Sequence, residues 1–157
     1  MSERVILEVG QQAPDFSLKD HRDATFTLSD LRGKRVVLFA YPAAMTPACT
    51  VEACEFQDAT ATLEAAGITV LCISPDSVEK LARFAERDSI EYPLLSDPDN
   101  ETLLAYGAFG EKKNYGRIYQ GVIRSTFVID AEGKVEHALY NIRATGHVAR
   151  VRKLLGV

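Results

Sequence analysis

YPAAMTPACTVEAC, residues 41–54, is the segment that says most about the fold, and it carries two of the three cysteines of the chain. It follows the apolar run RVVLFA, residues 35–40, which has the length and composition of a buried central strand. Thr46 is a favoured N-cap residue, and Pro47 is favoured at the first position of a helix. The segment therefore predicts a buried strand, a short turn and a helix over about residues 46–66.

Cys49 falls at the third position of this expected helix, close to its N-terminus. A side chain there lies near the positive end of the helix dipole and near backbone N–H groups that have no acceptor within the helix. Both features stabilise a thiolate relative to a thiol. We also expect the Thr46 hydroxyl to accept a hydrogen bond from the backbone N–H of Cys49. The pattern is typical of an activated cysteine nucleophile.

Cys54 lies five positions after Cys49, which places it about 140° around an ideal helix. The two α-carbons would be roughly 8.7 Å apart, whereas a disulfide requires less than about 7 Å. Cys49 shares an apolar stripe with Phe56 and Leu63, while Cys54 lies off that stripe beside Glu55. Two interpretations stay open. Cys54 is a small side chain without chemistry, or the helix start unwinds and lets Cys54 condense with a sulfenic acid at Cys49.

The rest of the chain alternates expected strands and helices, which indicates an α/β fold with a mixed central sheet. No linker, repeat or low-complexity tract is visible, so we expect a single domain over residues 1–157. The expected elements are a hairpin within 16–35, a strand at 68–74, a helix at 77–88, a strand at 92–97, a helix at 101–109, a hairpin at 125–141 that turns at Gly133, and a helix at 147–155.

Composition excludes several classes of function. A formal charge of −4, with 46% apolar and 25% charged residues, is ordinary for a globular domain and lacks the clustered cations of a nucleic-acid surface. The longest apolar run is shorter than the ~20 residues that span a bilayer, and the first residues lack the apolar core of a signal peptide. We therefore expect a cytoplasmic protein that contacts no membrane and no nucleic acid.

The sequence also gives no sign of a bound cofactor. His21, His137 and His147 show no ligand spacing with each other or with the cysteines, and no nucleotide-binding motif is present. We expect no metal and no organic cofactor. In a cytoplasmic protein the three cysteines are expected to be thiols rather than a structural disulfide framework.

The pattern P-x-x-x-T-x-x-C, here Pro42, Thr46 and Cys49, resembles the active-site signature of peroxiredoxins. TPACTVEACEFQDA, which contains Cys54, is similar to the bacterioferritin-comigratory-protein subgroup, also called PrxQ. FSLKD, ISPDSVEKLARF, YPLLSD and YGRIYQGVIRSTFVID also resemble that subgroup, so the resemblance covers nearly the whole chain. It implies a thioredoxin-like fold with an N-terminal β-hairpin and a mixed central sheet flanked by helices, and a monomer.

The resemblance also implies a thiol-dependent peroxidase. Cys49 would be the peroxidatic cysteine that reduces hydrogen peroxide and organic hydroperoxides, and Cys54 would resolve its sulfenic acid as an intramolecular disulfide. Thioredoxin or a similar dithiol carrier would then reduce the disulfide. Two alternatives stay open: an external low-molecular-weight thiol resolves Cys49, or the protein is a redox sensor or holdase that reports oxidation to a partner.

Four further residues receive roles from the same resemblance. Thr46 would hydrogen-bond the peroxide and the thiolate, and Pro42 would shield the thiolate from solvent. Arg124 would flank the site with a fixed positive charge, and Glu52 would help to hold that arginine. A carboxylate one turn from a cysteine disfavours the thiolate form of that cysteine, unless a cation pairs with the carboxylate. Cys72 lies in an apolar strand and is expected to be buried and inert, with a role as a backup resolving thiol as the alternative.

Overall fold

The computed structural model describes residues 5–43, 46–114, 116–143 and 146–156. Within these residues, one mixed sheet has the strand order β2-β1-β5-β4-β3-β8-β9. Its strands are β1 (Ser17–Lys19), β2 (Thr25–Thr27), β3 (Arg35–Ala40), β4 (Ile68–Ser74), β5 (Leu94–Ser96), β8 (Ser125–Ile129) and β9 (Val135–Leu139). A separate two-stranded sheet contains β6 (Phe109–Asn114) and β7 (Arg117–Val122).

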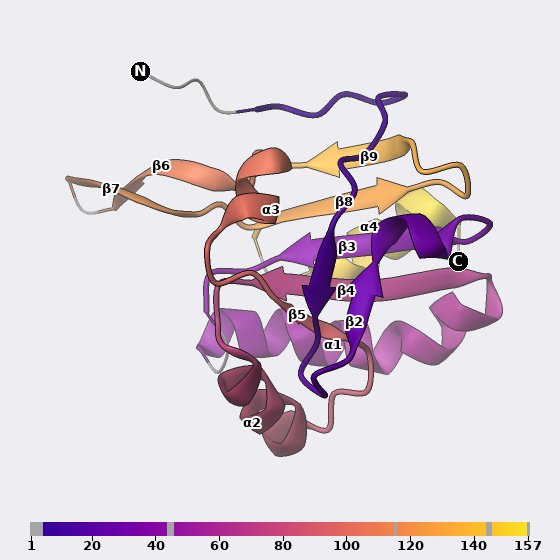
Figure 1. Cartoon of the computed structure of the whole chain (residues 1–157), viewed down its shortest axis with the longest axis horizontal. Coiled ribbons are helices and arrows are strands. Elements are labelled where there is room, and N and C mark those ends of the chain that lie inside the picture. Colours follow the sequence, from indigo (N-terminus) through magenta and orange to yellow (C-terminus); the bar gives the residue numbers. More distant parts are fainter. Residues whose placement is uncertain (1–4, 44–45, 115, 144–145, 157) are drawn as a thin grey trace.

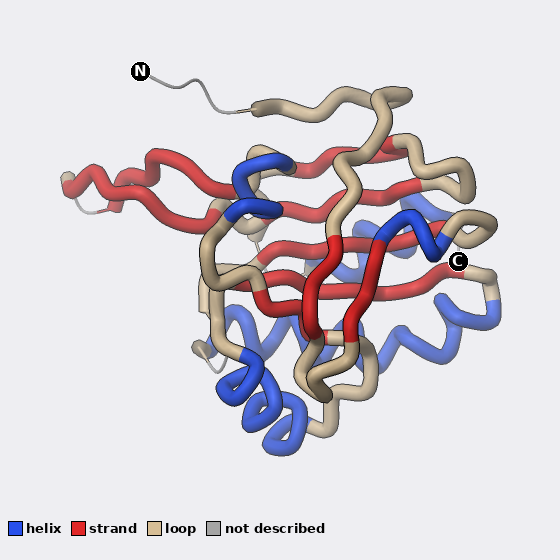
Figure 2. Tube along the Cα trace, in the orientation of Figure 1, coloured by secondary structure: helices blue, strands red, loops and turns tan. Residues whose placement is uncertain are grey.

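Helices cover the sheet unequally. They are α1 (Pro47–Ala65), α2 (Val78–Asp88), α3 (Glu101–Ala105), α4 (His147–Leu155) and the short 3₁₀ helix η1 (Leu28–Leu31). One buried cluster joins α1, α2 and α4 to the side chains of Val37 and Phe39 on β3. A second cluster on the opposite face joins η1, α3 and the N-terminal segment to Val36 and Leu38. The alternation of side chains along β3 thus supplies both cores, and Figure 2 shows α1 running along the central strands.

The central position of β3 was predicted correctly. β3 pairs in parallel with β4 and antiparallel with β8, and Val36 to Ala40 are all buried. A strand buried on both faces reads as a continuous apolar run, which is how RVVLFA appears in the sequence. Because β3 leads directly to α1, the centre of the sheet sets the position of the helix that carries Cys49 and Cys54.

Most of the other expected elements are also present. The β1–β2 and β8–β9 hairpins are both antiparallel, and Gly133 turns the second with a φ of 86°. Ser77 caps α2 by accepting a hydrogen bond from the backbone N–H of Lys80. Gly146 and Gly156 bound α4 as expected. The prediction of an α/β fold with a mixed sheet and an N-terminal hairpin is therefore confirmed.

Residues 109–122 were not assigned strands from the sequence, and the helix expected at 101–109 ends at Ala105. Gly107 has a φ of 74°, a conformation that cannot continue a helix, and a Cβ there would lie 1.8 Å from the carbonyl oxygen of Val5. The chain then forms the β6–β7 ribbon, which projects from the body of the molecule (Figure 1). Its strands pair with each other and with no other described strand.

A helix that crosses a bilayer needs about 20 predominantly apolar residues, which sets a test of length and apolarity for the described helices. None of them is both long and apolar enough to cross a membrane.

Candidate active site

The start of α1 places Cys49 as the sequence predicted. Thr46 is the N-cap with an extended backbone (φ −78°, ψ 154°), and Pro47 is in the first turn. The side chain of Cys49 is 1% exposed and belongs to the apolar face that packs on the sheet. Pro42 is half-buried in the turn between β3 and α1. Ala44 and Met45 of the same turn lie outside the described residues.

The expected hydrogen bond from the backbone N–H of Cys49 to the Thr46 hydroxyl is wrong. Thr46 makes no side-chain cap bond; its hydroxyl donates to the carbonyl oxygen of Ala43 at 2.9 Å. The turn after β3 brings this carbonyl within reach, and a hydroxyl that serves as donor to it turns away from the helix. The N–H of Cys49 therefore stays available to a negatively charged atom near the sulfur.

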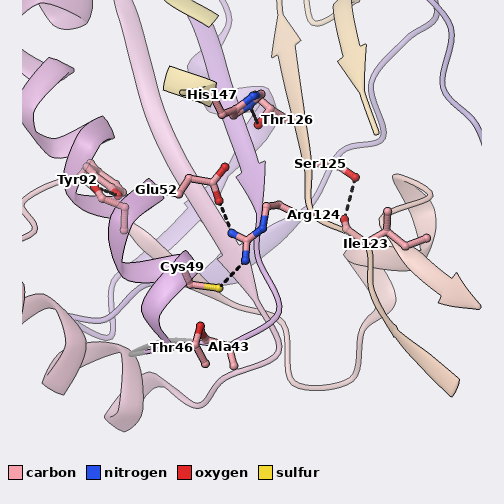
Figure 3. A network of polar contacts seen from close by, with 11 residues as sticks. Ala43, Thr46, Cys49, Glu52, Tyr92, Ile123, Arg124, Ser125, Thr126 and His147 are labelled. Carbon is pink, nitrogen blue, oxygen red and sulfur yellow. Dashed lines mark hydrogen bonds and ion pairs between the residues drawn. The ribbon is translucent and has the colours of Figure 1, made fainter. Parts of the chain in front are cut away.

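Arg124, which comes from a distant part of the sequence, contacts the sulfur of Cys49 at the start of α1 (Figure 3). Its Nη2 donates to the Sγ of Cys49 at 3.1 Å, and its Nη1 donates to Oε1 of Glu52 at 2.6 Å. The residue lies between β7 and β8, and its carbonyl oxygen accepts a hydrogen bond from the backbone N–H of Ile142 at 3.0 Å. Burial by itself lowers the pKa of Arg124, but the charges of Cys49 and Glu52 outweigh this effect and raise it. The guanidinium is thus a fixed cation at the thiol.

Glu52 supplies the second acceptor for Arg124. Its side chain is fully buried, and Oε2 has no hydrogen-bond partner among the described residues. Burial raises the pKa of Glu52 from 4.5 to about 7, although the charge and hydrogen bond of Arg124 act in the opposite direction. The carboxyl group is therefore divided between its charged and neutral forms near neutral pH. The pairing with a cation, on which the expected role of Glu52 depended, is present in the structure.

Cys54 has different surroundings. It is half-buried and lies in the same unbroken helix as Cys49 but off its apolar stripe, and both residues are free thiols. Burial raises the pKa of Cys54, the carboxylates of Asp88 and Asp58 raise it further, and Arg87 lowers it. The structure therefore keeps Cys54 apart from Cys49 and favours its protonated form.

Cys72 is fully buried in β4, as expected. Burial raises its pKa well above the ordinary value, so the thiolate form is strongly disfavoured. Between the neighbouring strand β3 and α1, Phe39 and Phe56 stack with ring centroids 4.4 Å apart. The hydroxyl of Tyr92 donates to the carbonyl oxygen of Ala53 at 2.7 Å. These contacts fix the first half of α1 against the sheet and the loop before β5.

His147 is the residue near the site that the sequence did not indicate. It is buried at the start of α4, and its Nε2 lies 2.7 Å from the hydroxyl of Thr126. Burial, together with the positive charges of Arg150 and Arg124, lowers its pKa to about 4, so the imidazole is neutral at pH 7. The only sequence signal was its place after Gly146 at a helix start. Its approach to Arg124 depends on how α4 packs, which spacing along the chain does not reveal.

The arrangement supports nucleophilic chemistry at sulfur. A buried thiol at a helix N-terminus, next to a guanidinium, can develop negative charge and pass it to a bound oxygen. Contacts across 72 and 75 positions of sequence join Arg124 to Glu52 and Cys49. In the described part of the chain, no group of three His, Cys, Asp or Glu side chains could hold a metal ion.

Comparison with known proteins agrees with this chemistry. Residues 9–138 match the model of the AhpC/TSA family. The chain is 50% identical to a provisionally named peroxiredoxin of Mycobacterium tuberculosis over all 157 residues, which is 100% of both chains. It is 44% identical to peroxiredoxin Bcp of Escherichia coli K12 over 141 residues, which is 90% of each chain.

A solved structure of the bacterioferritin comigratory protein of Xanthomonas campestris superposes with a TM-score of 0.88 at 30% identity, covering 98% of both chains. The chain therefore belongs to the AhpC/TSA family and, within it, to the peroxiredoxins of the bacterioferritin-comigratory-protein, or PrxQ, subgroup. Its class of activity is that of a thiol peroxidase, and the expected thioredoxin-like fold is confirmed.

Proposed function

We propose that this chain reduces hydrogen peroxide and organic hydroperoxides through Cys49. The observation that carries the proposal is the 3.1 Å contact between Arg124 Nη2 and Cys49 Sγ. The thiolate attacks one peroxide oxygen, and the O–O bond breaks. Sulfur keeps that oxygen as a sulfenic acid, while the other oxygen leaves with the bonding electrons and takes a proton to become water or an alcohol.

The surrounding residues support this step. Negative charge develops on the leaving oxygen, where the guanidinium of Arg124 and the free backbone N–H groups at the start of α1 stabilise it. Within the proposal, Thr46 hydrogen-bonds the peroxide once its hydroxyl leaves the carbonyl of Ala43, and Pro42 shields the thiolate from water. Glu52 positions Arg124 rather than reacting, since its Oε1 accepts a hydrogen bond from Nη1 of that residue.

The second step of the proposal is resolution by Cys54. Its thiol attacks the sulfenic acid of Cys49, an S–S bond forms, and the oxygen leaves as water with the thiol proton. Cys54 is half-exposed whereas Cys72 is fully buried, which favours Cys54 as the partner. Thioredoxin or a similar dithiol carrier then returns both cysteines to thiols. Because α1 is continuous across both residues, its first turns must unwind before the two sulfur atoms can meet.

Peptide mapping without reductant tests the pairing. The wild type and the Cys54→Ser and Cys72→Ser variants are each treated with one equivalent of hydrogen peroxide. A Cys49–Cys54 disulfide is expected in the wild type and in Cys72→Ser, whereas Cys54→Ser accumulates the Cys49 sulfenic acid, which dimedone traps. A wild type without this disulfide contradicts the intramolecular scheme, and a Cys49→Ser variant that still turns over peroxide contradicts the peroxidase proposal.

The continuity of α1 favours one other candidate, in which an external low-molecular-weight thiol resolves Cys49. Steady-state peroxide consumption by Cys54→Ser separates the two schemes. The intramolecular scheme predicts loss of turnover with the thioredoxin system, and the external scheme predicts unchanged turnover with a small thiol as reductant. The proposal further takes the chain as one domain that acts as a monomer, which sedimentation of the reduced and oxidised protein tests.

A further inference from the structure

Three hydrogen bonds join the face of α1 that carries Cys54 to residues 87–92. Nη2 of Arg87 donates to the hydroxyl oxygen of Thr50 at 2.9 Å. The hydroxyl of Tyr92 donates to the carbonyl oxygen of Ala53 at 2.7 Å, and the backbone N–H of Glu91 donates to Oε1 of Gln57 at 2.6 Å. We call these six residues the seam.

The side chain of Cys54 lies beside the seam on α1. Thr50, Cys54 and Gln57 are spaced by four and three positions, so their side chains lie on one face of the helix. The bonds at Thr50 and Gln57 therefore bracket the thiol along this face. Arg87 and Asp88 lie at the end of α2. The charge of Asp88 raises the pKa of Cys54 and that of Arg87 lowers it, so this end of α2 lies near the thiol. Release of Cys54 from the helix therefore requires the seam to separate.

The three bonds are not equally protected. The bond from Tyr92 to Ala53 is buried, and the ring of Tyr92 also packs edge-on against Phe39 with centroids 5.9 Å apart. The side chain of Arg87 is 47% exposed. Thr50 follows Cys49 directly, so its bond to Arg87 lies nearest the helix end that must unwind. Separation of the seam therefore begins at Arg87 and Thr50.

Arg87 is held in position for this bond. Its Nε donates to Oδ2 of the neighbouring Asp88 at 2.8 Å, and its guanidinium lies over the ring of Phe84, 5.8 Å from the centroid. Both contacts come from the last turns of α2, and they orient the remaining donors toward α1. Arg87 is thus fixed on α2 and links that helix to α1 through its hydrogen bond to Thr50.

We propose that Arg87 is a positioning residue that sets the rate of disulfide formation by holding Thr50, and with it the first turns of α1, in the helical state. The inference rests on the proposed resolution by Cys54. Loss of the hydrogen bond between Arg87 and Thr50 makes unwinding of the first turns of α1 more frequent. Cys54 then reaches the sulfenic acid of Cys49 sooner. The reaction of Cys49 with peroxide precedes unwinding and depends on Arg124, which takes part in none of the three hydrogen bonds of the seam.

The first test measures amide hydrogen exchange in the reduced protein, which requires no peroxidase activity. Thr50→Val removes the acceptor oxygen but keeps a β-branched side chain of similar size, so helix propensity is nearly constant. Arg87→Gln removes the cation. Each variant is expected to exchange about threefold faster in residues 47–57, as expected for one partly exposed hydrogen bond. Residues 58–65 of α1 should not change.

Two matched variants serve as controls. Arg83→Gln removes an exposed arginine one turn earlier on α2 that is not part of the seam, and should exchange like the wild type. Thr50→Ser keeps the hydroxyl acceptor and should restore wild-type exchange.

The second test follows one turnover after a single equivalent of hydrogen peroxide. Quenching and mass spectrometry give the rate of sulfenic acid formation at Cys49 and the rate of the Cys49–Cys54 disulfide. Thr50→Val and Arg87→Gln should leave the first rate unchanged and increase the second about threefold. A merely structural role would not accelerate one step and spare the other.

Unchanged exchange over residues 47–57 in Thr50→Val and Arg87→Gln would overturn the proposal. Faster exchange without faster disulfide formation would also overturn it, because the seam would then not limit the rate. A wild type that forms no Cys49–Cys54 disulfide contradicts the proposed function of Cys54, and with it the kinetic role of Arg87. The exchange data would still decide separately whether Arg87 holds α1.

Discussion

The two faces of α1 give its two reactive cysteines opposite surroundings. Cys49 is buried against the sheet, with the guanidinium of Arg124 at 3.1 Å from its sulfur. Cys54 is half-exposed, and burial together with Asp88 favours its neutral thiol. One helix thus holds one thiol beside a guanidinium and the other near carboxylates. Orientation around the helix, rather than distance along the chain, therefore gives the two cysteines different surroundings.

Removal of Arg124 should have the largest effect on the difference between the surroundings of Cys49 and those of Cys54. Arg124→Gln removes the charge from the Cys49 side, and the rate constant for reaction with hydrogen peroxide is expected to fall about 100- to 1,000-fold, as for loss of one donor to a developing oxyanion. Stopped-flow competition measures this rate constant. Arg117→Gln on the exposed ribbon is the matched control and should react like the wild type. A loss below about tenfold would show that the helix start alone activates Cys49.

The buried carboxyl of Glu52 should make stability depend on pH. Its pKa is about 7 in the folded chain against 4.5 for an ordinary glutamate, so the folded state binds the proton more tightly. The free energy of unfolding therefore decreases as pH rises from 4.5 to 7, by up to about 3 kcal/mol from this group. Urea unfolding of Glu52→Gln should lack this slope. Glu64→Gln, an exposed carboxylate near the end of the same helix, is the control. An unchanged slope in Glu52→Gln would contradict the assignment.

His147 should give the opposite response on the same side of α1. Its pKa is lowered from 6.5 to about 4, so the folded state binds the proton less tightly than the unfolded chain. Stability from this group is present above pH 6.5 and is lost as pH falls toward 4, by up to about 3 kcal/mol. Urea unfolding of His147→Gln between these pH values should show a reduced loss in acid, with His137→Gln as the control. An acid response identical to the wild type would show that another group is responsible.

The smallest effect is expected on the Cys54 side. Asp88→Asn removes a carboxylate that disfavours the Cys54 thiolate. Alkylation of Cys54 by iodoacetamide at pH 8, measured by mass spectrometry in a Cys49→Ser background, should become about two- to threefold faster. Glu79→Gln, an exposed substitution in the first turn of α2, should change nothing. Slower alkylation in Asp88→Asn would indicate that loss of the contact to Arg87 outweighs the loss of charge.

The local elements were predictable because their signals lie close together in the sequence. Thr46 and Pro47 mark the start of α1, and this start fixes Cys49 in its first turn and Cys54 on another face. The contacts of Arg124 could not be derived from spacing, because 72 or more positions separate it from its partners. Only the resemblance to a family indicated that residue.

The errors have a common physical origin in tertiary contacts. The Thr46 hydroxyl donates to Ala43 instead of accepting from Cys49, because the turn presents a carbonyl oxygen to it. The β6–β7 ribbon has a polar sequence with exposed Ile118 and Tyr119, so it lacks the alternating pattern of a half-buried strand. Arg87 and Thr50 are ordinary exposed positions until the packing of α2 against α1 brings them together.

The projecting ribbon also has a practical consequence. Its base is closed where the backbone N–H of Ile123 donates to the carbonyl oxygen of Ala108 at 2.7 Å, and both residues are buried. This closure fixes the chain at the residue before Arg124. We therefore expect the projecting end of the ribbon to tolerate a fluorescent reporter or an affinity tag without a change in the reaction of Cys49.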